Sequence, residues 1–225
     1  MPWFDDETYE FLADLADNNE RAWFQANKSR YEAAIKDPAL AFIGDFAPHL
    51  ATVSEQFAAI PKAQGGSLFR IYRDTRFSKD KTPYKTHLGM HFKHVRAKDV
   101  HAPGFYLHVE PGGTFFGAGM WHPESSAVRA IRASIDTNRE EWGAVKDALA
   151  EGGLALGGDT LKRIPRGYDK EHPLAEDLKR KDFIVSCEVP EEVVMSDGLM
   201  EHFTGLCRGA APLQRFLCAA IDVAF

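Results

Sequence analysis

The sequence predicts an α+β fold in which an antiparallel β-meander of about four or five strands packs with N-terminal and C-terminal helices. Three patterns support this class. Apolar residues recur at helical spacing over the first sixty residues, alternate with polar residues between residues 86 and 120, and return to helical spacing after residue 123. Short strands joined by short turns indicate an antiparallel sheet, because parallel strands need long crossovers. We expect a single domain over residues 1–225.

Three helices are predicted at the N-terminus. Asp5 or Asp6 can cap the first helix, and the polar residues 17–19 end it. The second helix contains Trp23, Phe24, Tyr31 and Ile35. A third begins after Asp37-Pro38 and is interrupted by Pro48, because proline lacks the N–H that continues a helix.

The strands and the later helices follow from the same reasoning. The hairpin signal Pro111-Gly112-Gly113 separates two of the predicted strands. Helices open after His122-Pro123 and near Asn138, and a last amphipathic helix is marked by apolar residues from Leu213 to Ala224. The predicted strands span Ser67–Arg73, Thr86–Val95, Gly104–Glu110, Thr114–Met120 and Phe183–Val189.

Composition limits the classes of protein that fit. The chain is 44% hydrophobic and carries a net charge of −6, which argues against a protein that wraps nucleic acid non-specifically. The three cysteines, Cys187, Cys207 and Cys218, have no CxxC spacing, so we expect reduced thiols in the core. Residues 1–10 do not resemble a signal peptide, and no apolar run approaches the ~18 residues of a membrane helix. We therefore expect a soluble cytoplasmic protein without a membrane partner.

A basic stretch stands out against this acidic background. Between Arg70 and His101 there are nine lysines or arginines and three acidic residues. Guanidinium and ammonium groups bind phosphate and carboxylate, so the loop from Arg73 to Lys85 within this stretch is predicted to bind an anion. The alternative is a network of ion pairs in which Asp74 and Asp80 hold the loop in place. The predicted ligand-binding residues are Arg70, Arg73, Arg76, Lys79, Lys81 and Lys85.

Polar residues of the predicted meander gather on one face of the sheet. Alternation places His87 and His91 on the same side as Tyr106, His108 and Glu110, opposite the apolar residues of both strands. Histidine titrates near neutral pH, so His108 and Glu110 are the predicted acid–base pair, with Tyr106 beside them. Two alternatives remain: a divalent metal site built from His87, His91, His108 and Glu110, or an ordinary polar surface.

Other motifs give less chemistry. Gly117-x-Gly119 is not a dinucleotide fingerprint, because a strand rather than a helix should follow the turn. Glycines inside a strand instead permit a bulge, or the close approach of another backbone or of a ligand. The chain also lacks a P-loop motif and a GxSxG nucleophile motif.

Several of these segments together resemble a widespread bacterial and fungal family known as a domain of unknown function. The similarity spans most of the chain, with weaker echoes at residues 18–24 and 162–173. It implies no activity, cofactor or catalytic residue. The motifs that carry it are FRIYRD at residues 69–74, RFSKDKTPYK at 76–85, GFYLHVEPGG at 104–113, and GAG at 117–119 with Trp121 and Pro123.

The leading hypothesis is a protein that binds a phosphate-bearing or other anionic small ligand at the basic loop beside the polar sheet face. Whether it is an enzyme is left open, as are its cofactor and its oligomeric state. One alternative is a non-catalytic module that docks nucleic acid or an acidic protein through the basic loop. The other is the histidine and glutamate metal site.

Overall fold

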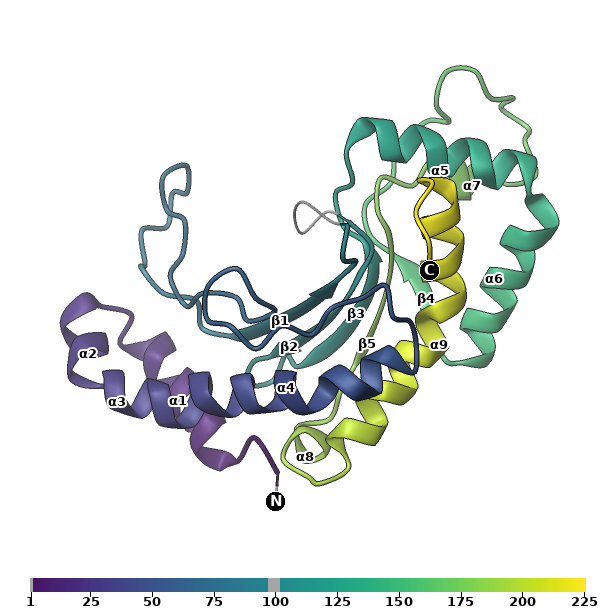
Figure 1. Cartoon of the computed structure of the whole chain (residues 1–225). Coiled ribbons are helices and arrows are strands. Elements are labelled where there is room, and N and C mark those ends of the chain that lie inside the picture. The colour runs from purple at the N-terminus through teal and green to yellow at the C-terminus, as the bar shows by residue number, and fades with distance from the viewer. Residues whose placement is uncertain (1, 97–101) are drawn as a thin grey trace.

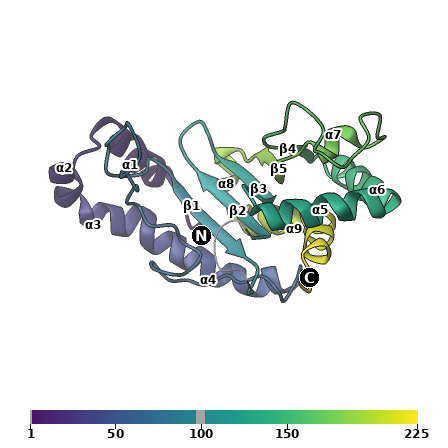
Figure 2. The same ribbon diagram turned by 90° about the horizontal axis from the view of Figure 1, so that it is seen from above.

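The computed structural model describes residues 2–96 and 102–225, and Figure 1 and Figure 2 show it in two orientations. Its centre is a five-stranded sheet in the order β1-β2-β3-β5-β4, with every neighbouring pair antiparallel. The α+β class is confirmed. The strands are β1 (Leu88–Lys93), β2 (Gly104–Val109), β3 (Phe115–Met120), β4 (Ala155–Gly157) and β5 (Phe183–Glu188).

The N-terminal helices differ from the prediction at two prolines. The third and fourth helices and the π-helical turn between them follow one another without a gap, so no break occurs at Asp37-Pro38. Pro38 lies in the first turn of its helix, where a missing N–H costs little, and the helix passes Pro48 and ends at Ala51. These elements are α1 (Asp6–Asp17), α2 (Arg21–Ala26), α3 (Lys28–Tyr31), η1 (Glu32–Lys36) and α4 (Asp37–Ala51).

The C-terminal half supplies five further helices. The last of them, α9, begins well before the predicted start, because Met200, Phe203 and Cys207 extend its buried stripe toward the N-terminus. None of the helices in the described ranges is long and apolar enough to cross a membrane. The five are α5 (Ser125–Thr137), α6 (Arg139–Glu151), α7 (Ala175–Leu178), α8 (Glu191–Val194) and α9 (Leu199–Ala220).

Helices α4 and α9 cover one face of the sheet, below it in Figure 1. The ring centroid of Phe46 on α4 lies 4.7 Å from that of Phe92 on β1 and 4.9 Å from that of Phe203 on α9. The apolar residues of β1 and β2 that were predicted to face the core are all buried. Cys207 and Cys218 are buried too, as predicted, whereas Cys187 is only partly buried.

Two strand predictions are corrected. Residues 67–73 do not form a strand: Leu68 bridges Met90 of β1, whereas Tyr72 bridges Tyr84 within the following loop. The segment therefore changes partner after about three residues, too soon for a regular ladder. Strand β4 was not predicted, because it has only three residues next to paired glycines. Part of the predicted charged turn at residues 96–103 lies outside the described residues.

Candidate functional site

The face of the sheet that points away from α4 and α9 is here called the open face (Figure 2). In the register of β1 and β2, His91 pairs with Tyr106, and Gly89 pairs with His108. The ring of His87, just before β1, lies 4.3 Å from the ring of His108. The alternation of the two strands therefore places the predicted polar residues on one face.

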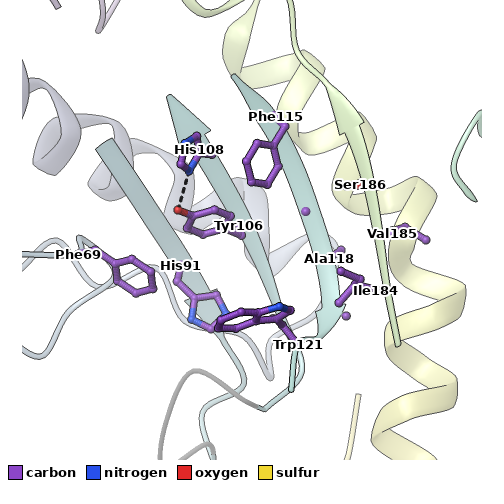
Figure 3. A pocket seen from close by; sticks show the side chains of 13 residues that line it. Phe69, His91, Tyr106, His108, Phe115, Ala118, Trp121, Ile184, Val185 and Ser186 are labelled. Carbon is purple, nitrogen blue, oxygen red and sulfur yellow. Dashed lines mark hydrogen bonds between the residues drawn. The ribbon is translucent and has the colours of Figure 1, made fainter. Parts of the chain in front are cut away.

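A cavity of about 490 Å³ occupies the open face (Figure 3). Strands β2 and β3 contribute most of its lining, β5 closes one side, and Phe69 comes from the segment that runs beside β1. The small residues of β2 and β3 in the lining, Gly104, Gly117, Ala118 and Gly119, leave the centre of the cavity open. The larger side chains that surround it are Phe69, His91, Tyr106, His108, Phe115, Trp121 and Ile184.

A series of hydrogen bonds runs along β2 to this cavity. The hydroxyl of Thr86 donates to Oε1 of Glu110 at 3.1 Å, and Oε2 of Glu110 lies 3.0 Å from Nε2 of His108. Nδ1 of His108 lies 3.0 Å from the hydroxyl of Tyr106, which lines the cavity. The ring of Phe115 stacks on that of His108 at 4.6 Å. Both nitrogens of His108 are therefore engaged, and its ring is fixed in orientation.

The surroundings shift the pKa values of these groups. Burial raises the pKa of Tyr106, and the charge of Glu110 raises it further. Burial alone would raise the pKa of Glu110, but the hydrogen bonds from His108 and Thr86 outweigh it and hold the pKa below its usual value. Burial lowers the pKa of His87 and of His91 to about 4. At neutral pH both histidines are uncharged, and Glu110 is a carboxylate.

Three of the predicted metal ligands come close enough to share an ion. One ligand atom from each of His87, His108 and Glu110 lies within 4.8 Å of the other two. His91 is not part of this group; its ring lies over Gly104 instead. An ion bound at Nε2 of His108 would replace the hydrogen bond between that atom and Glu110.

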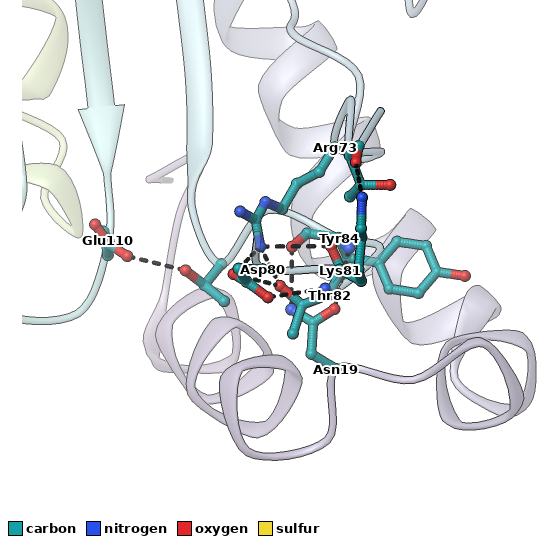
Figure 4. Close-up of polar contacts among 9 residues, drawn as sticks. Asn19, Arg73, Asp80, Lys81, Thr82, Tyr84 and Glu110 are labelled. Carbon is teal, nitrogen blue, oxygen red and sulfur yellow. Dashed lines mark hydrogen bonds and ion pairs between the residues drawn. The ribbon is translucent and has the colours of Figure 1, made fainter. Parts of the chain in front are cut away.

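Residues 70–85, here called the basic loop, pair many of their charges internally (Figure 4). The guanidinium of Arg73 donates to Asp80 and to the hydroxyl of Thr82. Arg76 donates to Asp74 at 2.6 Å, and Nζ of Lys81 donates to the carbonyl of Thr75 at 2.8 Å. The pairing of both aspartates with arginines, proposed as the alternative to an anion site, is present.

The other three basic residues differ in their relation to the cavity. Nζ of Lys85 lies 4.9 Å from the ring centroid of Phe69, which lines the cavity. Burial lowers the pKa of Lys85, and the charge of Arg70 adds to this effect. Arg70 lines a second cavity of about 630 Å³ that shares Phe69 with the first. Lys79 is exposed and lines neither cavity.

Sequence reasoning missed several residues that shape this region. Asn19 donates to the carbonyl of Tyr84 and accepts from its N–H, both at 3.0 Å (Figure 4). Phe24 stacks on the ring of Tyr84 at 4.1 Å. The N-terminal helices thereby anchor the end of the basic loop. The signal was the motif at residues 18–24, but nothing in the sequence shows which residue it contacts. Phe69 and Phe115 are apolar, and Thr86 was predicted only as the first residue of a strand, so the sequence did not mark any of the three as part of a site.

Comparison with known proteins places the chain in a family. Neither a curated protein nor a solved structure matches it. The model of a conserved hypothetical protein family, DUF2461, matches residues 7–216, which includes every residue of the open face and the basic loop described above. The chain therefore belongs to the DUF2461 family of conserved hypothetical proteins.

Proposed function

We propose that the open face is an active site that binds a small organic anion and moves a proton on it. The observation that carries the proposal is the series of hydrogen bonds from Thr86 through Glu110 and His108 to Tyr106, whose last member lines the cavity. Concave sites with an apolar lining and a few converging polar groups are where small ligands bind. A carboxylate that orients a histidine is the usual arrangement for general base catalysis.

The roles follow from the two ends of the His108 ring. The carboxylate of Glu110 accepts a hydrogen bond and so places a proton on Nε2. Nδ1 is then the acceptor, and the hydroxyl of Tyr106 donates to it. A proton leaving the ligand would pass to the oxygen of Tyr106 as Tyr106 gives its own proton to His108. Glu110 would stabilise the imidazolium that forms.

Lys85 is the cation that we assign to the acidic group of the ligand. Of the six basic residues predicted to bind a ligand, it alone contacts a residue that lines the cavity by a described side-chain interaction. Among the described residues, its ammonium has no acidic partner within ion-pair distance, whereas Arg73 and Arg76 each have one. A partly desolvated ammonium that packs against a ring of the cavity lining favours an anion.

Binding of simple aryl anions tests this assignment. We expect phenyl phosphate to bind the wild type measurably in isothermal titration calorimetry, and Lys85→Met to weaken it at least about tenfold. Lys79→Met is the matched control, since it removes the same charge from an exposed site that does not line the cavity. Equal affinities for the two variants would contradict the role of Lys85.

The orientation of His108 tests the proton-transfer part independently of any substrate. We expect NMR of the histidine ring nitrogens to show the proton of neutral His108 on Nε2, and Glu110→Gln to redistribute it between the two nitrogens. Thr86→Val is the milder variant, because it removes one hydrogen bond to Glu110 and leaves the carboxylate in place. A proton found on Nδ1 in the wild type would overturn the proposed direction of transfer.

A divalent metal site at His87, His108 and Glu110 is the second candidate. It is favoured because one ligand atom from each residue lies within 4.8 Å of the other two. Two imidazoles and a carboxylate form a common catalytic zinc site. We expect protein that has been dialysed against chelator to bind one added Zn²⁺ per chain. His87→Ala should abolish this binding, and His91→Ala should preserve it. Weak, non-stoichiometric uptake by the wild type would remove this candidate.

A further inference from the structure

Four glycines lie on the open face, and their surroundings differ. Gly89 of β1, Gly104 of β2, and Gly117 and Gly119 of β3 all point to this side of the sheet. Glycine inside a strand weakens it, because it costs chain entropy and offers no side chain to pack. Each of these positions therefore needs a local reason for glycine.

Three of the four have a reason within the chain. A Cβ atom on Gly89 would lie 2.6 Å from the hydroxyl oxygen of Tyr106, whose ring occupies that space. A Cβ atom on Gly104 would collide with the ring of His91 in the same way. Gly119 has a φ angle of +118° and backs onto the main chain of Phe183, so both its conformation and its space exclude a side chain.

Gly117 is the exception. The nearest atoms to a Cβ atom there belong to the side chains of Phe115 and Tyr106, both at 3.8 Å, which is ordinary van der Waals contact. Its φ angle is not positive, so its backbone conformation does not demand glycine. The space above Gly117 belongs to the cavity, and no side chain of the described residues fills it. The missing side chain is explained if something outside the chain packs there.

The shape and chemistry of this space select a flat ring. Its floor is bare strand backbone, and the rings of Tyr106 and Phe115 stand at its edge with centroids 5.8 Å apart (Figure 3). Aromatic walls favour stacked or edge-to-face contact with another aromatic ring. Phe69 lies beside Tyr106, with ring centroids 5.8 Å apart, and leads to the ammonium of Lys85.

We infer that the ligand is an aryl anion whose aromatic ring lies over Gly117, against Tyr106 and Phe115, while its acidic group extends toward Lys85. This inference rests on the proposed function for the acidic group and adds the class of compound that the cavity selects. The ring would lie beside Cβ and Cδ1 of Tyr106. The hydroxyl of Tyr106 lies over Gly89 next to Phe69, so the proposed proton transfer would take place on the side of the ligand that extends toward Lys85. Non-planar rings and bare anions would bind more weakly.

The test combines three probes with two variants. Calorimetry should show phenyl phosphate binding more tightly than cyclohexyl phosphate or inorganic phosphate. Gly117→Val fills the space above the strand, so it should weaken phenyl phosphate at least about tenfold and leave inorganic phosphate unchanged. Lys85→Met should weaken both. Gly117→Ala, which adds a single methyl group, should have a smaller effect of the same sign and replaces the valine variant if that variant unfolds.

The outcomes separate the two ideas. If Gly117→Val and Gly117→Ala bind phenyl phosphate as well as the wild type, or if cyclohexyl phosphate binds equally well, the ring does not lie on Gly117. If Lys85→Met changes no affinity while the glycine variants do, the ring assignment survives and the proposed anion site is wrong. If phenyl phosphate does not bind saturably at millimolar concentrations, both are wrong.

Discussion

The open face and the basic loop contain most of the polar residues that the sequence singles out, but they use them in different ways. In the basic loop, charged groups find partners nearby in the sequence: Arg76 pairs with Asp74, and Arg73 pairs with Asp80. On the open face, the contacts that enclose the cavity come from segments far apart in the chain. Phe69 reaches Tyr106 from the segment beside β1, and His91 reaches it from β1 itself.

This difference explains why a dense run of charge is a poor guide to a site. Arginines and aspartates that are close in sequence can neutralise one another in a loop, and exposed pairs of this kind contribute little to stability. The residues of the open face have few charges but are largely buried along a cavity, where each buried polar group needs a partner. We therefore expect substitutions near the open face to have larger effects than substitutions in the basic loop.

The largest effect on stability is expected at Gly119 of β3. Gly119→Ala should lower the free energy of unfolding by about 3 kcal/mol, because the new methyl group combines a strained φ angle with a clash against Phe183. Gly117→Ala, two residues away, should change it by less than about 0.5 kcal/mol. Urea unfolding of both variants measures the difference. Similar losses at the two positions would contradict the distinction between them.

The next comparison is between two carboxylates: Asp182 is buried beside the sheet, whereas Asp80 is exposed in the basic loop. Asp182 accepts hydrogen bonds from the N–H of Asp159 and from the N–H and ring of His122. We expect Asp182→Asn to lower the free energy of unfolding by about 2 kcal/mol at neutral pH, since it places an amide among buried donors. Asp80→Asn should have a much smaller effect, because its charge is exposed to solvent and to salt.

Stability at acid pH gives a second comparison of Asp182 with Asp80. Burial raises the pKa of Asp182, but its hydrogen bonds outweigh this and lower it. The hydrogen bonds from Thr82 and Arg73 lower the pKa of Asp80 to about 2. A lowered folded-state pKa stabilises the fold above the unfolded pKa of about 3.9, and this contribution disappears as pH falls through the folded-state value. Unfolding between neutral pH and about pH 2 should therefore depend less on pH in Asp182→Asn than in the wild type, in high salt as well as in low salt.

Asn19 connects the two halves of the comparison, because it anchors the basic loop at Tyr84. Asn19→Ala removes two hydrogen bonds to the backbone of Tyr84 and should cost about 1 kcal/mol. Asn19→Asp keeps the acceptor for the N–H of Tyr84 and loses only the donor, so its cost should be smaller. Hydrogen exchange at the amide of Tyr84 measures the local effect. Unchanged protection in Asn19→Ala would show that Phe24 holds the loop alone.

The smallest effect is expected at Arg76, whose partner Asp74 is its near neighbour in an exposed turn. Arg76→Ala should leave the melting temperature and the affinity for phenyl phosphate unchanged. A loop that docks nucleic acid would behave differently: Arg76→Ala and Lys79→Met would each weaken binding of a single-stranded oligonucleotide and reduce its salt dependence by about one charge.

Much of the open face could be predicted from local pattern, but its enclosure could not. The alternation of β1 and β2 was enough to place His91, Tyr106 and His108 on one side of the sheet. The same reasoning failed for residues 67–73, where apolar alternation predicted a strand although the segment divides its pairing between β1 and its own loop. The prolines were also given too much weight as helix breakers: Pro38 lies in the first turn of α4, where a missing N–H costs little, and the helix continues past Pro48 to Ala51.

The α+β class, the apolar face of the sheet and the polar residues along β2 could be predicted from the sequence alone, whereas the pairing of aspartates with arginines in the basic loop was one of two interpretations that it left open. These depend on periodicity and on contacts between near neighbours in the chain. The tertiary structure was needed to show that Phe69 and Phe115 line a cavity, that Lys85 packs against Phe69 and that Gly117 lies uncovered on its floor. Those features depend on strand order and on which rings lie over which glycines, and a linear pattern does not encode either of these contacts.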